Sequence, residues 1–123
     1  MFLKIVIILL AGKELEVPRN TDIYIINQGL IAESLAMDLS RKLRNYDLIV
    51  ELDLSGVSFS KQFKKANKLK SKSIIVIGDD EAAKREFLIR LFDQSDKQNK
   101  EEVIPFEDDT RLEKWINNNL LTK

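Results

Sequence analysis

The sequence contains neither cysteine nor histidine. Without cysteine, disulfide bonds and thiolate chemistry are excluded, and without histidine the usual acid–base group near neutral pH is missing. Zinc sites built from these two residue types are excluded as well. The absence of cysteine fits the cytoplasmic location that we predict, although it does not require one. No motif calls for a cofactor, and we expect none.

The chain also lacks net charge, because 20 lysines and arginines balance 20 aspartates and glutamates. A protein held to nucleic acid by its overall positive charge is therefore excluded, and any such binding must come from a local patch. At 123 residues, 44% of them hydrophobic, the chain is long enough for one domain with a real core.

No apolar run is long enough to cross a bilayer, which needs roughly 20 residues, so we expect no membrane partner. The longest apolar run extends from Met1 to Leu10 and is interrupted only by Lys4. We divide the chain into an apolar segment and linker (residues 1–20) and an α/β domain (residues 21–123). The apolar segment is expected to fold back onto the sheet, to mediate self-association or to dock on another subunit.

Strands and helices alternate in the first part of this domain. In the helix predicted from Leu30 to Arg44, Ile31 begins a stripe of large apolar residues at steps of four, which indicates that this stripe is buried. Strands are predicted at residues 23–26, 47–53 and 73–78, and a second helix begins near Ser58. Such alternation predicts a largely parallel sheet with helices on both faces.

The pattern changes in the second part. Residues 87–92 and 103–106 are predicted to be strands, joined by the polar run 93–100 as a long hairpin connection. Pro105 indicates that the last strand lies at an edge or ends at this residue. Thr110 and Glu113 have the spacing of a capping box, which predicts that the closing helix starts at Thr110.

The helix that follows Ser58 carries the clearest charge pattern. Phe59, Phe63 and Ala66 share one apolar stripe, and six lysines without any acid lie between Lys61 and Lys72. A helix N-terminus beside cations is suited to a phosphate backbone. The alternative is a solvated lysine-rich face, which is what most charge runs form.

Three acids follow the strand at residues 73–78, at an edge where open α/β sheets usually bind ligands: Asp79, Asp80 and Glu81. They are candidates for a Mg²⁺ site, a carboxylate pair or acceptors for a base edge, and the alternative is a solvated capping turn. Arg90 lies on a predicted strand and points away from the face of Ile89 and Leu91. A lone strand arginine more often forms an ion pair than a ligand contact.

Residues 22–120 resemble the anticodon-binding domain of class II aminoacyl-tRNA synthetases, most closely that of histidyl-tRNA synthetase. The resemblance is carried by Asp22-Ile23-Tyr24-Ile25-Ile26, by Asp53 to Gly56, by Ser58-Phe59-Ser60-Lys61-Gln62-Phe63-Lys64-Lys65-Ala66-Asn67-Lys68-Leu69, by Ile75-Val76-Ile77-Gly78-Asp79-Asp80-Glu81, and by the strand with Arg90. It implies a three-layer α/β/α fold. The five-stranded mixed sheet would be mostly parallel, with one late antiparallel strand.

The resemblance also implies a function, which is binding of a tRNA anticodon stem-loop, here that of histidine tRNA. Glu81 would accept hydrogen bonds from a base edge, and Arg90, where the histidyl branch more usually has lysine, would contact a base or a phosphate. The other RNA-binding residues expected lie on the lysine-rich helix: Ser58, Lys61, Gln62, Lys64 and Lys65. Because a class II catalytic domain does not fit in this length, we expect a detached or truncated domain that is no enzyme by itself. A catalytic domain, or a second copy, would then be a partner through Met1 to Leu10.

Two other classes remain open. One is a protein-interaction or regulatory domain that has kept the fold without binding RNA. The other is a small-molecule enzyme or a phospho-receiver with Mg²⁺ at Asp79, Asp80 or Asp53. A receiver would also need an acidic pair after the first strand, where Asn27 and Gln28 stand.

Overall fold

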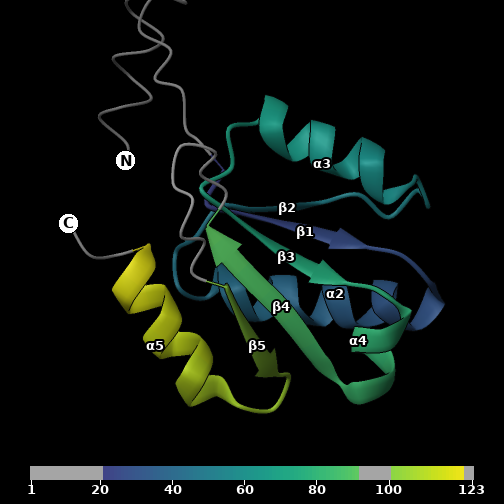
Figure 1. The fold of residues 1–123 in the computed structure, drawn as a ribbon. Helices are drawn as coiled ribbons and strands as arrows, with labels where there is room; N and C mark the ends of the chain where they lie inside the picture. Colours follow the sequence, from purple (N-terminus) through teal and green to yellow (C-terminus); the bar gives the residue numbers. More distant parts are fainter. Residues whose placement is uncertain (1–20, 92–100, 121–123) are drawn as a thin grey trace, which may run out of the picture.

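The computed structural model describes residues 21–91 and 101–120. The predictions for Met1 to Leu10 and for the polar run 93–100 lie outside the described residues. The elements follow in the order β1 (Ile23–Asn27), α2 (Leu30–Arg44), β2 (Val50–Leu52), α3 (Phe59–Lys68), β3 (Ser73–Ile77), α4 (Asp79–Lys84), β4 (Glu86–Leu91), β5 (Glu101–Pro105) and α5 (Asp109–Asn119). Figure 1 shows the helices arranged around a single twisted sheet.

The sheet has five strands in the order β2-β1-β3-β4-β5. β1 runs parallel to both β2 and β3, whereas β4 runs antiparallel to β3 and to β5. This confirms the predicted mixed sheet with one late antiparallel strand. Pro105, which has no amide hydrogen to donate, lies in edge strand β5, as its chemistry predicts.

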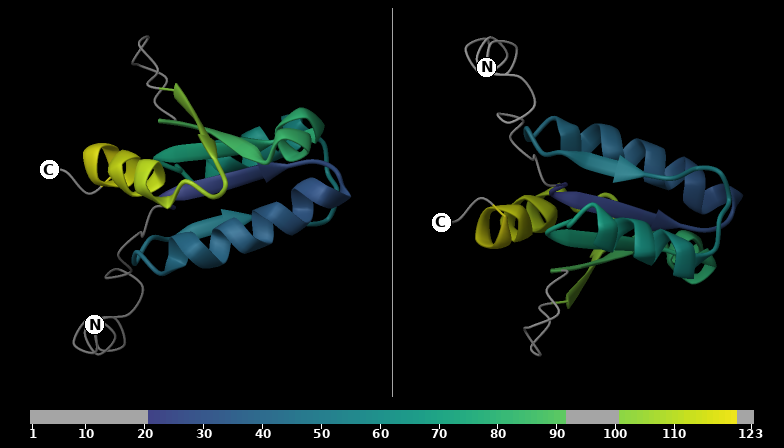
Figure 2. Two further views of the ribbon diagram at one scale, coloured as in Figure 1. Left: turned by 90° about the horizontal axis from the view of Figure 1, so that it is seen from below. Right: turned by 90° about the horizontal axis from the view of Figure 1, so that it is seen from above.

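Helices cover both faces of the sheet, as the alternation of elements predicted. On one face, α2, α4 and α5 enclose the larger apolar core, with side chains such as Leu39, Phe87 and Trp115. On the other face, α3 is the one helix among residues 21–91 and 101–120 that covers a small cluster around Tyr24 and Ile74. Figure 2 shows α2 and α3 on opposite sides of β1. The face under α3 is therefore the less covered one.

Several boundaries differ from the predictions for local reasons. β2 contains three residues instead of the predicted seven, because Asp47 turns the chain with φ 64°. The short helix α4 was not predicted from the acids that open it. The closing helix is capped by Asp108, whose carboxylate accepts a hydrogen bond from the Arg111 amide at 3.2 Å, so the predicted capping box at Thr110 is wrong.

The stripe predicted for α2 is correct except at its first member. Leu35, Leu39 and Leu43 are buried, whereas Ile31 is 67% exposed. The helix places Ala32 and Ala36 toward the sheet beside the leucines, so the buried stripe begins one residue later than the step of four indicated. Ile31 is thus left on the outside of the first turn.

Candidate nucleic-acid interface

The first turns of α3 and α4 meet at the end of the sheet where β1, β2 and β3 finish. The Ser58 hydroxyl accepts a hydrogen bond from the Lys61 amide at 3.3 Å and caps α3. A Cβ on Gly78, the residue before α4, would lie 3.4 Å from the Phe59 ring. The first turns of the two helices therefore lie next to each other, and the N-terminus that favours anions is that of α3, because three acids already occupy the first turn of α4.

Glu81 lies in the first turn of α4 and is half-buried. One of its carboxylate oxygens, Oε1, accepts a hydrogen bond from the Gly78 amide at 2.8 Å. Glu81 therefore caps α4, which is the role that the sequence offered as the alternative to recognition of a base. A carboxylate offers about four acceptor positions, so this bond holds the group in place and leaves acceptor capacity for a ligand.

Arg90 lies on β4 on the same side of the sheet as α3. Its register partners are Ile74 on β3 and Glu101 on β5, and two residues earlier Leu88 pairs with Val76 and Val103 in the same way. Arg90 and Leu88 are half-buried, and Val103 is 41% exposed. No described helix covers this part of the sheet, which agrees with the predicted direction of Arg90.

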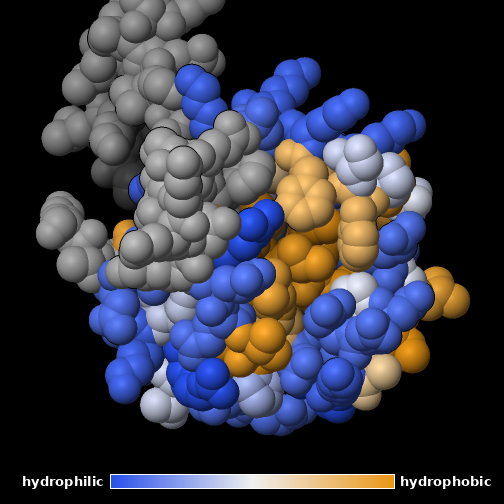
Figure 3. All heavy atoms as spheres, viewed as in Figure 1, coloured by the Kyte–Doolittle hydropathy of each residue, from blue (hydrophilic) through white to orange (hydrophobic). Residues whose placement is uncertain are grey.

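The apolar side chains on this side form what we call the open sheet face. It comprises Phe59 and Phe63 of α3, Val76 of β3, Leu88 of β4 and Val103 of β5, together with Arg90. In the space-filling view, hydrophobic residues are visible at the centre of this side, between hydrophilic residues (Figure 3). Phe59 and Phe63 were predicted as core residues, but both are only half-buried. Their availability to a ligand was therefore missed.

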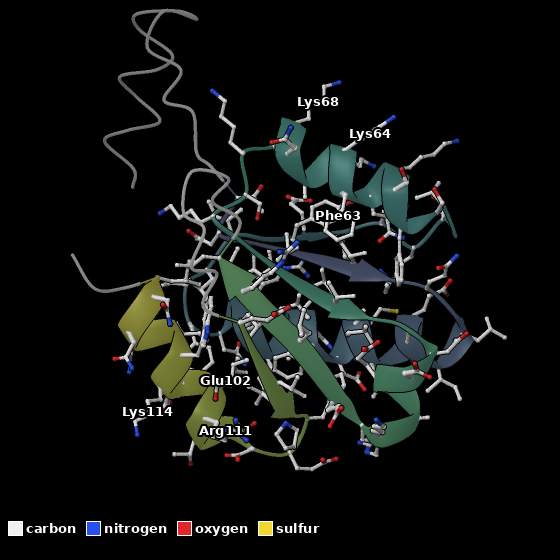
Figure 4. The ribbon with its side chains drawn as sticks, viewed as in Figure 1. Phe63, Lys64, Lys68, Glu102, Arg111 and Lys114 are labelled. Carbon is white, nitrogen blue, oxygen red and sulfur yellow. The ribbon has the colours of Figure 1, made fainter. Side chains whose placement is uncertain are left out.

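The lysines of α3 do not all lie on the same side of the helix. Lys61, Lys64 and Lys68 recur at steps of three and four and are exposed, and we call them the lysine ridge. Figure 4 shows Lys64 and Lys68 pointing away from the sheet, whereas Phe63 lies between the helix and the sheet. Lys61 is in the first turn of α3, and Lys68 is at the other end of the helix. The ridge thus lies on the side of α3 that faces away from the sheet.

Lys65 has a partner inside the domain. Its ammonium group lies 3.0 Å from the Asp53 carboxylate, which also accepts hydrogen bonds from the hydroxyl and the amide of Ser55 at 2.6 and 2.8 Å. The Ser55 bonds, followed by Lys65, lower the pKa of Asp53 from 3.8 to about 2. The same pairing raises the pKa of Lys65. This ion pair ties the turn after β2 to α3.

Gln62 corrects one predicted RNA contact. Its side chain is fully buried, accepts a hydrogen bond from the Asn27 amide at 2.9 Å, and donates to the carbonyls of Asn27 at 2.7 Å and Val57 at 2.9 Å. A side chain enclosed in this way cannot reach a base. The sequence contained the signal, since position 62 completes the i, i+3, i+4, i+7 stripe that begins at Phe59.

The acids predicted for Mg²⁺ do not gather. Over residues 21–91 and 101–120, no three aspartates or glutamates come together in an arrangement that could hold a metal ion. Asp79 instead approaches Gly29, where a Cβ would lie 2.6 Å from its Oδ1. Gly29 also has φ 113°, so glycine is required at this turn for two reasons. In the same described ranges, no helix combines the length and hydropathy that a membrane crossing requires.

Residues 4–108 match the model of a protein family described as an anticodon binding domain. The histidine–tRNA ligase of Prochlorococcus marinus strain MIT 9312 is 84% identical over 117 residues, which are 95% of this chain and 28% of that protein. A histidine–tRNA ligase from Synechococcus sp. strain CC9902 is 47% identical over 81 residues, covering 65% of this chain and 18% of its own length. The chain therefore spans less than a third of these relatives.

Solved structures agree in fold. An apo histidyl-tRNA synthetase from S. aureus superimposes with a TM-score of 0.65 and 24% identity, over 88% of this chain and 30% of that one. A prolyl-tRNA synthetase from Cryptosporidium parvum superimposes with a TM-score of 0.61 and 13% identity, over 80% and 22%. With the family match, the relatives and the mixed five-stranded sheet in agreement, this chain belongs to the anticodon-binding domains of class II aminoacyl-tRNA synthetases, in the form that histidine–tRNA ligases carry.

Proposed function

We propose that this domain binds the anticodon stem-loop of a tRNA, that for histidine, as part of a histidine–tRNA ligase. The observation that carries the proposal is the open sheet face, where Arg90 lies among apolar side chains near the start of β3 and Phe59 approaches the first turn of α4 at the other end of that strand. An uncharged chain offers RNA no general attraction, so such a local surface is needed.

Unpaired bases need both stacking surfaces and hydrogen-bonding groups. The half-buried rings of Phe59 and Phe63, with Leu88 across the sheet, supply an apolar surface for base faces. Base–aromatic stacking is worth about 1–3 kcal/mol per base. An anticodon loop, whose bases are splayed from a stem, suits this surface better than a continuous duplex does.

Arg90 and Glu81 supply complementary polar groups for the same loop. The guanidinium group carries five donors and fits the acceptor edge of a guanine or a phosphate. The Glu81 carboxylate, held in place by the Gly78 amide, accepts from an amino group of a base. One residue thus selects acceptors and the other selects donors, which is what discrimination among bases requires.

The lysine ridge binds phosphates in this proposal, and not bases. Lys64 and Lys68 point outward from α3 and reach the backbone of a stem that passes over the helix. Such contacts set affinity and position but carry no sequence information. Lys65 contributes less, because Asp53 already neutralises it. The domain works without a cofactor, in the cytoplasm, and aminoacylation requires the remainder of the ligase.

Fluorescence anisotropy with two labelled RNA hairpins tests this function. The hairpins share one stem and loop length, and they carry either the histidine anticodon or an unrelated one. We expect tighter binding of the histidine hairpin and about a tenfold loss for Arg90→Ala. Glu81→Gln should reduce the difference between the hairpins more than it reduces affinity.

Lys114→Ala is the matched control, since this exposed cation lies on α5, away from the open sheet face. It should leave both affinities unchanged. Equal binding of the two hairpins by the unaltered chain would refute base recognition. Equal losses for Arg90→Ala and Lys114→Ala would refute the assignment of the open sheet face.

A further inference from the structure

The open sheet face presents apolar side chains that the described part of the chain does not cover. Leu88 of β4 is half-buried, and its register partner Val103 on edge strand β5 is 41% exposed. On the other side of Leu88, Val76 of β3 is half-buried as well, and so is Phe63 of α3. Soluble domains rarely expose an apolar area that extends over several strands, so such an area marks a surface on which something docks.

The sequence contains one segment that needs a surface of this kind, Met1 to Leu10. Residues 2–10 are all apolar except Lys4, so this segment has no polar side to turn toward water. Burying a large apolar side chain contributes about 1.5–3 kcal/mol, whereas ordering the backbone of one residue costs about 1–2 kcal/mol. Docking is therefore favourable only on a surface that receives most of the segment, and an area spread over three strands meets this requirement.

The chain enters the domain at the end of the sheet where Arg90 lies. The Thr21 carbonyl accepts a hydrogen bond from the amide of Lys72, which is two residues before the register partner of Arg90 on β3. Residues 11–20 can span up to about 33 Å, whereas the six residues of β4 extend over about 20 Å. From Thr21, the apolar segment can therefore reach any part of the open sheet face.

Covalent connection also decides which occupant reaches the face first. A segment joined to its binding surface by a short linker has an effective concentration on the order of mM, which a second copy or another partner attains only in concentrated solution. We propose that Met1 to Leu10 docks on the open sheet face of its own domain and buries Leu88 and Val103. Of the three roles expected for this segment, the proposal selects folding back onto the sheet and names the face. The docking does not depend on RNA binding, but under the proposed function the segment and an anticodon loop compete for this face.

Labelling of single engineered cysteines with iodoacetamide tests the docking, because the chain contains no cysteine of its own. Val103→Cys reports on the open sheet face. Met37→Cys, on α2 across the sheet, is the matched control, since Val103 is 41% and Met37 is 42% exposed. Each is made in the 123-residue chain with and without the double substitution Ile5→Asp and Ile8→Asp. We expect the double substitution to accelerate labelling at position 103 by at least about tenfold, as for a segment that is docked most of the time, and to leave position 37 unchanged.

Leu88→Cys repeats the measurement at a second point of the face and should respond in the same direction. Equal labelling rates with and without the double substitution at positions 88 and 103 would overturn the proposal. An equal acceleration at position 37 would overturn it too, because the double substitution would then loosen the whole fold. Labelling that slows as the protein concentration rises would show that a second copy is the occupant. No RNA is present, so failure of the hairpin titration leaves these rates unaffected, and the two proposals fail separately.

Discussion

Gln62 connects three backbone segments through one side chain. Its amide group bonds to both backbone polar groups of Asn27 at the end of β1 and to the Val57 carbonyl in the loop before α3. Because the site is fully buried, no water can replace these partners without opening the domain. Gln62 therefore fixes the start of α3, which carries the predicted RNA contacts Ser58 and Lys61, while its own side chain stays enclosed.

Gln62→Leu should lower the free energy of unfolding by about 2–4 kcal/mol, since it leaves buried backbone groups of Asn27 without partners. Urea unfolding followed by circular dichroism measures the loss. Lys64→Leu, a change at an exposed position of the same helix, is the control and should alter stability by less than about 0.5 kcal/mol. A similar effect of the two substitutions would contradict the assigned hydrogen bonds.

Asp53 makes stability depend on pH in the acid range. Its pKa is lowered to about 2 in the folded chain, so the carboxylate stabilises the fold above its ordinary pKa of 3.8. That contribution, about 1–2 kcal/mol after allowance for the partly exposed pair with Lys65, is lost as the pH falls from about 4 to about 2. The stability gap between the unaltered chain and Asp53→Asn should therefore shrink over this interval.

Urea unfolding at pH 7 and at pH 2.5 measures that gap. Asp38→Asn, an exposed acid on α2, provides the comparison. A gap for Asp53→Asn that is equally large at both pH values would show that the Ser55 and Lys65 contacts do not depend on the charge of Asp53.

At the scale of elements, the N-terminal cap of α5 is a residue other than the one that the sequence pattern predicted. The Asp108 carboxylate accepts the Arg111 amide, two residues before the threonine that the capping-box spacing indicated. Asp108→Ala should lower the free energy of unfolding by about 1 kcal/mol, and Thr110→Ala should change it by less than about 0.5 kcal/mol. Thermal and urea unfolding of both variants checks this. The reverse order would restore Thr110 as the cap.

The helices and strands were predictable where the pattern of apolar residues fitted only one type of element. The β-branched run at Ile23 and the leucine spacing of α2 predicted both elements with nearly correct ends. The prediction failed where a neighbouring residue competed, as with Asp108 against Thr110. It failed again at Ile31, because a period of four drifts around a helix of 3.6 residues per turn and the true stripe moves by one position. Gln62 was missed because a polar side chain occupies a buried position of the apolar stripe.

The candidate site was predictable only in part, because it depends on how much of one sheet face α3 leaves uncovered. The direction of Arg90 followed from strand alternation, and the cap at Ser58 from helix chemistry. No local pattern indicates that α3 covers only part of its face, which leaves Phe63 and Leu88 open to a ligand. Likewise, the split between the lysine ridge and that face appears only when α3 is placed on the sheet.

For the whole molecule, a zero net charge makes RNA binding sensitive to single lysines. Each phosphate contact on a double-stranded stem contributes about 0.9 to the slope of log affinity against log salt concentration. Lys64→Ala should reduce the slope by about that amount and weaken both hairpins equally. Anisotropy titrations at several salt concentrations give the slope, with Lys114→Ala as the control. An unchanged slope for Lys64→Ala would place the stem away from α3.

The brevity of β2 bears on how this domain behaves at high concentration. β2 ends the strand order on its side and has three residues, with the exposed acid Glu51 in the middle. A foreign strand that tried to extend the sheet there would gain few backbone bonds and would meet a carboxylate. We therefore expect the β2 edge to resist pairing with a further strand, and Glu51→Val is the substitution that should weaken this protection.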